Sequence, residues 1–384
     1  MSALLTTTRA LLPAMTADVL ALVGCESPSH DRVAVARSAD LITEVGTRLT
    51  GVPPERIERD GRAHLRWRFG TGPRRVVVLA HHDTVWPVGS LATHPAQVQD
   101  GVLRGPGGFD MKTGIVQALT AIGLLADGRP DRLDGLSLLV TADEEIGSPT
   151  SRALIESEAA GCAAAFVLEA AGPEGALKTG RKGTSWYHLR ITGRAAHAGL
   201  EPERGANAGI ELARQILSVV EFADPAAGTT VTPTTASAGS TANTVPATAG
   251  LDVDVRVWTV AEQQRVDRAM QAVAATVPGC SVVVEGGINR PPMDPASGAG
   301  LFERARTLAG THGLGALAAM SVGGGSDGNF TAGIGVPTLD GLGACGGGAH
   351  ADDEHVLLDA LPGRTALLIA LLADQLGLAL PGTP

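Results

Sequence analysis

Three short apolar runs, at 76–80, 136–142 and 163–168, restrict this chain to a sheet-based fold. Each run is mostly apolar and as long as one strand, which is typical of strands buried on both faces of a parallel sheet. A helical pattern at 113–128 separates the first two runs, and this alternation predicts an α/β sheet with helices on both faces. Polar residues follow the runs directly: His81, His82 and Asp83; Asp143, Glu144 and Glu145; and Glu169.

The carboxyl ends of neighbouring parallel strands share one edge of a sheet, so we expect these polar side chains at a single rim. Ligands of open α/β sheets bind outside this edge. The sequence therefore predicts a functional site where the three runs end.

The section at 182–293 has a different pattern, with apolar residues that alternate along its strands. Strands are expected at 185–193, 228–239, 249–258 and 280–287, and helices at 205–223 and 260–277. The resulting β-α-β-β-α-β order is ferredoxin-like.

The α/β pattern resumes after this section. A helix is expected near 298–310, a strand at 336–343 and a last helix at 361–377. We therefore predict one domain formed by 1–181 and 294–384, interrupted by an inserted α+β domain at 182–293.

The bulk composition fits a large globular protein with small-molecule partners. A chain of 384 residues exceeds the size at which one core stops growing. The net charge of −10, without any Lys/Arg-rich stretch, argues against nucleic acid. No apolar run reaches the roughly 18 residues of a membrane span, and the N-terminal stretch 1–24 predicts an amphipathic helix, not a targeting signal. Four scattered cysteines without C-x-x-C spacing favour reduced thiols and a cytoplasmic location: Cys25, Cys162, Cys280 and Cys345.

Five clusters of imidazole and carboxylate residues indicate metal chemistry. They are HHD at 81–83, GPGGFDMKTG at 105–114, DEE at 143–145, LEA at 168–170 and GGGAH at 346–350. A single histidine after a strand is more often a capping residue, and an acidic pair is more often a solvated face. Together, however, carboxylates at the buried ends of apolar strands repel one another unless a cation or proton compensates them. A pair of divalent metals would supply that compensation.

At these residues the sequence resembles the dizinc metallopeptidase family that contains glutamate carboxypeptidase, succinyl-diaminopimelate desuccinylase and aminoacylase. The resemblance is closest to the carboxypeptidase G branch and extends over nearly the whole chain. The matching stretches are HHDTVWP, GPGGFDMKTG, TADEEIGS, VLEA, GRAAHAG, ANTVPATAG, DVDVRV, GGGSDGNF and GAHADDEHV. It implies a zinc-peptidase-like catalytic domain and an inserted domain that forms a homodimer.

The resemblance also implies the residues of the metal site. The expected ligands are His81, Asp110, Glu145, Glu169 and His350. Asp110 would bridge the two metals, with a cis peptide to Met111. Glu144 would be the general base and Asp83 would orient His81, which leaves His82 as a bystander. The implied cofactor is two Zn²⁺ per chain, or other divalent metals such as Co²⁺ or Mn²⁺.

Substrate-binding residues are implied in the same way. His197 would stabilise the oxyanion from across the dimer, and Asn243 and Arg256 would hold the substrate carboxylate. From pattern alone, Arg256 would be a solvated residue on the outer face of a strand. Gly325 would line the same pocket, and Arg290 fits either a hinge contact or substrate binding.

The implied function is a metal-dependent hydrolase that cleaves an amide bond with a zinc-activated water and releases a C-terminal amino acid. Its substrate would be a small N-acyl amino acid or a short peptide. The same metal core would also serve an N-acyl-amino-acid deacylase or a dipeptidase. A non-catalytic binding or scaffold protein on the same fold is a further alternative. A phosphate-ester hydrolase fits two metals, but the chain lacks a glycine-rich loop followed by Lys and Ser/Thr.

Overall fold

The computed structural model describes residues 2–381 and divides into two compact units. The first unit comprises Met1–Gly180, Asp294–Val322 and Ser326–Pro384. The second unit comprises Arg181–Met293 and Gly323–Gly325. Each unit has a hydrophobic core of its own.

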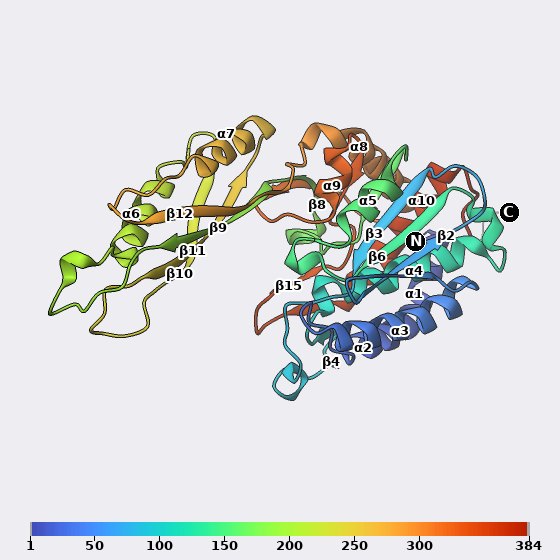
Figure 1. Cartoon of the computed structure of the whole chain (residues 1–384). Helices are drawn as coiled ribbons and strands as arrows, with labels where there is room; N and C mark the ends of the chain where they lie inside the picture. Colours follow the sequence, from blue (N-terminus) through green and yellow to red (C-terminus); the bar gives the residue numbers. More distant parts are fainter. Residues whose placement is uncertain (1, 382–384) are drawn as a thin grey trace. The chain divides into compact units, whose positions relative to one another are not determined.

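A six-stranded sheet forms the centre of the first unit (Figure 1). Its strands are, in sheet order, β1 (Glu55–Arg59), β2 (Arg62–Arg68), β6 (Leu136–Thr141), β3 (Val76–His81), β7 (Ala164–Val167) and β14 (Thr338–Leu339). The pairs β6–β3, β3–β7 and β7–β14 are parallel, whereas the β1–β2 hairpin joins β6 in antiparallel orientation. The predicted α/β fold with a mainly parallel sheet is confirmed.

Helices cover both faces of this sheet. They are α1 (Ala3–Ala10), α2 (Leu12–Val23), α3 (Arg32–Thr50), α4 (Thr113–Ala126), α5 (Arg152–Ala159), α8 (Pro295–His312), α9 (Gly328–Gly333) and α10 (Leu361–Leu376). Val76 and Val78 of β3 belong to one core cluster with residues of α4 and α10, while Val77 and Leu79 belong to another with residues of α5 and α9. Burial on both faces explains why β3 is apolar from Val76 to Ala80.

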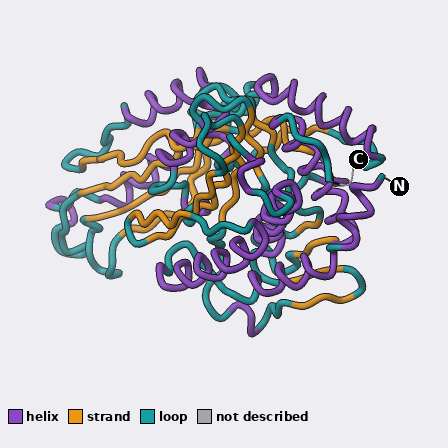
Figure 2. The backbone as a smooth tube through the Cα atoms, turned by 90° about the vertical axis from the view of Figure 1, so that its right-hand side faces the viewer, coloured by secondary structure: helices purple, strands orange, loops and turns teal. Residues whose placement is uncertain are grey.

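The first and last helices are neighbours, because α1 packs against α10 (Figure 2). One stretch of this unit, Gly108–Ala126, is as long and apolar as a membrane span, although 83% of it is buried inside the protein. It includes α4, whose Ile115, Leu119 and Ile122 have no exposed surface. The apolar character of the stretch is therefore explained by its position in the core of the first unit.

Two smaller sheets complete the first unit. One has the order β15 (Gly346–Gly347), β16 (His355–Leu357), β5 (Val102–Arg104) and β4 (Gln97–Gln99), all antiparallel. The other pairs β8 (Leu177–Arg181) with β13 (Ala319–Val322). Single turns of helix occur at Ser90–Ala92, Pro130–Leu133, Glu144–Ile146, Pro173–Gly175 and Leu358–Ala360, and an irregular turn at Gly108–Lys112.

The second unit is an antiparallel four-stranded sheet with two helices (Figure 1). Its elements are β9 (Gly183–Thr192), a single turn at Pro202–Arg204, α6 (Ala208–Val220), β10 (Thr230–Ala238), β11 (Thr248–Val257), α7 (Val260–Gln271) and β12 (Ser281–Arg290). The sheet order is β10-β11-β9-β12. Alternate residues of β11 are buried against the helices, which leaves the other face of the sheet accessible.

Three elements differ from the sequence-based expectation. The N-terminal stretch forms two helices that meet at Leu11, because Pro13 cannot continue the hydrogen bonding of α1. α7 ends at Gln271 instead of near 277, since the backbone N–H groups of Thr276 and Val277 donate to Glu211. The strand expected at 336–343 contains only two paired residues.

Candidate metal centre

The ends of three parallel strands bring polar side chains to one edge of the central sheet. β3 ends at His81, and the residues that follow β6 and β7 include Glu145 and Glu169. Backbone hydrogen bonds extend the pairing past the strands, from His82 N–H to Thr141 and from Leu168 N–H to Leu79. The rim expected from the sequence is therefore present in the first unit.

The first group of candidate ligands is His81, Asp110 and Glu169. His81 Nε2 lies 3.3 Å from Asp110 Oδ1 and 3.4 Å from Glu169 Oε1. On the other side of the ring, Nδ1 lies 3.0 Å from the backbone carbonyl of Asp83. A carbonyl only accepts, so Nδ1 carries a proton, and Nε2 is the ring atom that faces the two carboxylates.

The second group is Asp110, Glu145 and His350. His350 Nε2 lies 3.3 Å from Asp110 Oδ2 and 3.1 Å from Glu145 Oε2. The two oxygens of Asp110 therefore face different groups. His350 adopts a positive φ of 63° two residues after Gly348, which has a φ of 74°. This turn directs the imidazole at the carboxylates from a segment far from them in sequence.

Several ligand atoms in these groups are buried without a hydrogen-bond partner. Among the described residues, such atoms include His81 Nε2, Asp110 Oδ1 and Glu145 Oε1. Buried polar atoms normally have partners, so a cluster of exceptions calls for an ion or another bound group. Within each group the ligand atoms lie within 4.8 Å of one another, and imidazole with carboxylate is a donor set that suits zinc. These residues fit a pair of divalent metals that share Asp110.

Asp83 connects the ligand histidine to the acidic pair after β6. Its Oδ1 lies 3.5 Å from His81 Nδ1 and accepts the backbone N–H of Glu144 at 3.1 Å. Its Oδ2 accepts the backbone N–H of Glu145 at 3.2 Å and the hydroxyl of Ser29 at 2.6 Å. Asp83 thus fixes both the ring of His81 and the turn that carries Glu144 and Glu145.

Charge is concentrated at the two candidate metal positions. Burial raises the pKa of Glu145 to about 7, and contacts with Asp110 and Glu145 raise the pKa of His350 to about 10. Burial opposes ionisation of Asp110, but His350 and His81 outweigh it and hold the pKa of this carboxyl below its usual range. Protons on His350 and Glu145 offset the negative charge, and a divalent cation would offset the same charge.

Glu144 lies beside the ligands without belonging to either group. It is 8% exposed, and its charge acts on His81. Burial lowers the pKa of His81, but the contacts with Asp110, Asp83 and Glu169, together with the charge of Glu144, raise it well above the ordinary value. The Glu144 carboxylate therefore lies within electrostatic range of the candidate ligand His81.

The bridging position has the expected backbone, and His82 has a packing role. The peptide between Asp110 and Met111 is cis. His82 is fully buried, with Nδ1 3.2 Å from Ser38 Oγ and Nε2 3.0 Å from the Ala63 carbonyl. Burial lowers the pKa of His82 to about 4, so this ring stays neutral within the core.

The remaining predicted site residues belong to the second unit. His197 and Asn243 are exposed and adjacent, because His197 forms a bridge with Thr244 and the N–H of Ala198 donates to the Asn243 carbonyl at 2.9 Å. Arg290 is buried at the end of β12, where its carbonyl accepts from Gln263 Nε2 at 2.8 Å. The structure thus groups His197 with Asn243 beyond the end of β9, whereas Arg290 pairs with Thr184 near its start.

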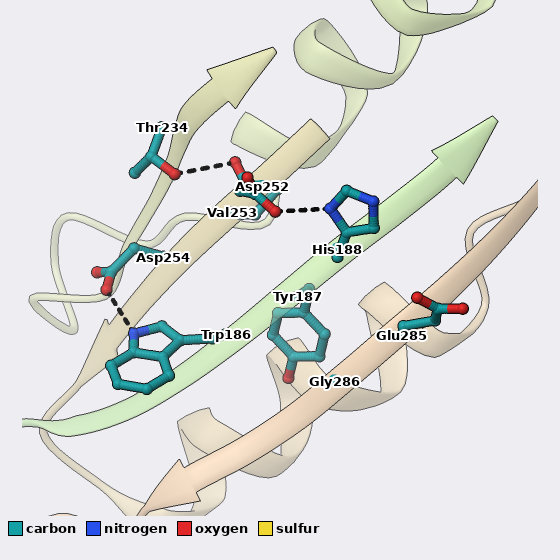
Figure 3. A pocket seen from close by; sticks show the side chains of 9 residues that line it. All are labelled: Trp186, Tyr187, His188, Thr234, Asp252, Val253, Asp254, Glu285 and Gly286. Atoms are coloured by element: carbon teal, nitrogen blue, oxygen red, sulfur yellow. Dashed lines mark hydrogen bonds and ion pairs between the residues drawn. The ribbon is translucent and has the colours of Figure 1, made fainter. Parts of the chain in front are cut away.

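Arg256 is engaged by a neighbour on its own strand. Its Nε and Nη2 donate to the two oxygens of Asp254, each at 2.8 Å, and Trp186 Nε1 donates to Asp254 at 2.9 Å. Trp186 and Asp254 point toward each other along a hollow of about 400 Å³ in this sheet (Figure 3). The pair with Asp254 uses two of the three guanidinium nitrogens of Arg256.

Three residues that support these positions were missed by sequence reasoning. Arg181 is 3% exposed and donates to the carbonyls of Gly324 and Gly325, at 3.0 and 3.3 Å. Ser29 fixes Asp83, and Glu354 accepts N–H groups around Asp110. None of the three has a local signal, because each acts on a segment distant in sequence.

A family profile and two curated relatives match most of this chain. Residues 77–374 match the profile described as peptidase family M20/M25/M40. Carboxypeptidase G2 from Pseudomonas sp. (strain RS-16) is 33% identical over 318 residues, which cover 79% of this chain and 75% of that protein. A succinyl-diaminopimelate desuccinylase from Dechloromonas aromatica (strain RCB) is 27% identical over 344 residues, which cover 84% of this chain and 89% of that protein.

Solved structures share the fold at lower sequence identity. An M20 family metallo-carboxypeptidase from Sulfolobus solfataricus has a TM-score of 0.75 at 17% identity, covering 94% of this chain and 98% of that chain. A dinuclear metal binding peptidase of the M20 family from Bacillus subtilis has a TM-score of 0.61 at 15% identity, covering 97% and 100%. Since the family profile spans most of the sequence, the chain belongs to peptidase family M20/M25/M40 and is a metallo-hydrolase.

Proposed function

We propose that this enzyme hydrolyses an amide bond and releases a C-terminal amino acid from a small N-acyl amino acid or short peptide. The observation that carries the proposal is the pair of ligand groups that share Asp110, with Glu144 beside them. The 33% identical carboxypeptidase G2 supports the direction of cleavage.

Two Zn²⁺ ions per chain are the proposed cofactor, and Co²⁺ or Mn²⁺ would suit the same donors. His81, Asp110 and Glu169 would hold one ion, and Asp110, Glu145 and His350 would hold the other. When bound, such a pair polarises a carbonyl and lowers the pKa of an attacking water.

Glu144 is the proposed general base. Its carboxylate would take a proton from the attacking water and later give it to the leaving amine. Asp83 supports this role because it holds the backbone N–H of Glu144 at 3.1 Å while it also contacts His81. The base and a metal ligand are thereby fixed by the same carboxylate.

The second unit is proposed to recognise the substrate. An arginine fork binds a carboxylate through two parallel hydrogen bonds, which makes Arg256 the proposed partner of the C-terminal carboxylate. Asp254 holds the guanidinium through Nε and Nη2 and so restricts its orientation. Gly325 would line the same pocket and Arg290 would contribute to it. His197 would stabilise the oxyanion from a second copy of the chain, and the adjacent Asn243 would reach the substrate carboxylate from that same copy.

A homodimer through the second unit is part of the proposal. Strand β10 is an edge strand with mostly exposed residues, and α6 exposes Ile210, Leu217 and Val220. Unpaired strand edges and exposed apolar side chains favour association. The scattered free cysteines support a reducing, cytoplasmic setting.

A substrate panel tests the proposal. Zinc-loaded protein would be incubated with N-acyl and N-peptidyl amino acids that differ in the acyl group or the C-terminal residue, and released amino acids measured by mass spectrometry against a chelated control. Chelator-sensitive release that depends mainly on the C-terminal residue is expected. No release from any member would contradict the proposal.

An N-acyl-amino-acid deacylase or dipeptidase is the second candidate. It is favoured by the similarity to succinyl-diaminopimelate desuccinylases, which covers most of this chain. In the same panel, release that depends on the acyl group and tolerates many C-terminal residues would support the deacylase, while release from dipeptides alone would support the dipeptidase.

A further inference from the structure

Glu354 is a buried carboxylate of the first unit that belongs to neither ligand group. It is 3% exposed and lies four residues after His350. In the sequence it ends an acidic run, Asp352, Asp353 and Glu354, which reads as a solvated turn. A carboxylate removed from water at this position requires several hydrogen bonds to offset the loss of hydration.

Both oxygens of Glu354 accept hydrogen bonds from two other segments. Oε1 accepts the backbone N–H groups of Phe109 at 2.9 Å and Asp110 at 3.1 Å. Oε2 accepts the backbone N–H of Gly107 at 3.0 Å and Nε1–H of Trp86 at 2.6 Å. Three backbone N–H groups thus surround one anion, which is the arrangement of a backbone nest.

The small sheet explains how this residue reaches the site. Glu354 directly precedes β16, and the pairing of His355 with Arg104 places it beside the turn that begins after β5. That turn contains Asp110, the ligand shared by both groups. Trp86 belongs to the segment that follows β3 and its ligand His81.

We propose that Glu354 is a positioning residue for the metal pair. It fixes the backbone of Asp110 relative to the segments that carry His81 and His350, so a change at Glu354 disturbs both metal positions together. The inference rests on the proposed metal centre, and it adds a residue that contacts no metal.

Replacement of the carboxylate by an amide separates this role from simple space filling. In Glu354→Gln, one acceptor oxygen becomes an NH₂ group, which only donates. Each oxygen of Glu354 faces two N–H donors, so either orientation of the amide loses two hydrogen bonds and opposes donor to donor.

Two further variants calibrate the effect. Trp86→Phe removes one of the four hydrogen bonds and keeps a ring beside His94, whose centroid is 4.9 Å from that of Trp86. Glu158→Gln alters an equally buried carboxylate of the same unit, which is held by Arg66, Arg68 and Ser137. It controls for the general cost of changing a buried charge.

The experiment measures Zn²⁺ affinity of the full chain by competition with a chromogenic chelator. The absorption spectrum of the Co²⁺-loaded protein and the melting temperature with and without metal are recorded as well. We expect Glu354→Gln to bind metal about 10–100-fold more weakly, as is typical when a group behind a ligand is lost, and to change the Co²⁺ spectrum. Trp86→Phe should show a smaller loss, and Glu158→Gln should bind like the wild type even if its metal-free melting temperature falls.

Wild-type affinity and an unchanged Co²⁺ spectrum in Glu354→Gln would overturn the inference and leave the metal centre standing. If wild-type protein binds no metal, the proposed metal centre and this inference fail together. If Glu354→Gln does not yield folded protein, Trp86→Phe carries the test, and unchanged affinity in that variant would overturn the inference.

Discussion

At the scale of single residues, the centre depends on carboxylates that bind backbone N–H groups as well as side chains. Asp83 accepts the N–H groups of Glu144 and Glu145, and its Oδ1 also lies 3.5 Å from His81 Nδ1. A backbone donor cannot rotate away as a side chain can, so these bonds fix the backbone positions of Glu144 and Glu145. The acidic residues therefore have two roles. Some face the candidate metal positions, and others hold the backbone behind them in place.

Replacement of Glu144 by Gln tests the general base. The amide keeps the size of the side chain but cannot accept a proton, so kcat should fall on the order of 10²–10⁴-fold, the usual contribution of a positioned base. Because Glu144 is in neither ligand group, metal content by elemental analysis should stay at the wild-type level. Undiminished turnover in the loaded variant would rule out this role.

Burial of His82 should make the folded protein less stable in mild acid. Its pKa is about 4 in the folded protein because of burial, against about 6.5 when unfolded. Between these pH values only the unfolded chain takes up the proton. The contribution of His82 to the free energy of unfolding is therefore fully present above pH 6.5. It falls by about 3 kcal/mol as the pH drops toward 4.

Urea unfolding of metal-free protein at pH 7 and pH 5 measures this effect. The buried His64 also has a lowered pKa, so the comparison is with His82→Gln, which retains every other titrating group. The variant should lose less stability between the two pH values than the wild type does. Equal losses would show that His82 does not contribute.

At the scale of elements, the polar residues at the ends of β3, β6 and β7 were the informative signal. The strands could be predicted because strands buried on both faces are apolar along most of their length, and parallel pairing then places their carboxyl ends together. The β1–β2 hairpin was not predicted, since its outer strand, Glu55–Arg59, has little apolar character. β4, β5, β15 and β16 are two or three residues long, too short for any periodicity to show.

The candidate site, like the fold, could be predicted only in part from the sequence. The polar clusters near strand ends could be found from residue types, whereas their roles came from the family resemblance. The structure brings the five candidate ligands together. Their assignment to two metals stays a prediction. Glu354 could not be found, because its partners lie about 250 residues away and depend on the pairing of β16 with β5. The engagement of Arg256 by Asp254 was likewise invisible in an alternating strand pattern.

Replacement by alanine should have opposite effects on stability at two helical glycines. A Cβ on Gly123 in α4 would lie 2.3 Å from the carbonyl oxygen of Leu49 in α3, whereas one on Gly300 in α8 would meet nothing within 4 Å. Alanine favours a helix interior over glycine by about 1 kcal/mol. We expect Gly300→Ala to stabilise the protein by roughly 0.5–1 kcal/mol and Gly123→Ala to destabilise it despite the better propensity.

Chemical denaturation of both variants provides the comparison. The two substitutions change the unfolded chain in the same way, so their difference isolates the contact between α3 and α4. Similar stabilisation by both would mean that α3 and α4 can separate without cost.

At the scale of the whole molecule, the ligand groups and the proposed substrate residues belong to different compact units. The first unit holds every candidate metal ligand, and the second holds His197, Asn243, Arg256 and Arg290. Under the proposed function, the first unit would carry the metal chemistry and the second unit would recognise the substrate.

The proposed dimer predicts an oligomer that depends on the second unit. Light scattering after gel filtration should give twice the chain mass of 39.0 kDa. Leu217 is 69% exposed on α6, and Leu217→Glu should shift the protein toward monomer. Val33→Glu, at a 66% exposed position on α3 of the first unit, should leave the mass unchanged. A wild-type monomer would rule out the proposed interface.

The most direct test is a metal titration of the metal-free enzyme with turnover as one readout and bound metal as the other. Zn²⁺ would be added in steps, and hydrolysis of the best substrate from the panel compared with metal per chain by elemental analysis. The two ligand groups that share Asp110 predict turnover that rises to a plateau at two metals per chain and is abolished by chelation. Turnover that persists after complete removal of metal, or a protein that binds none, would contradict the account.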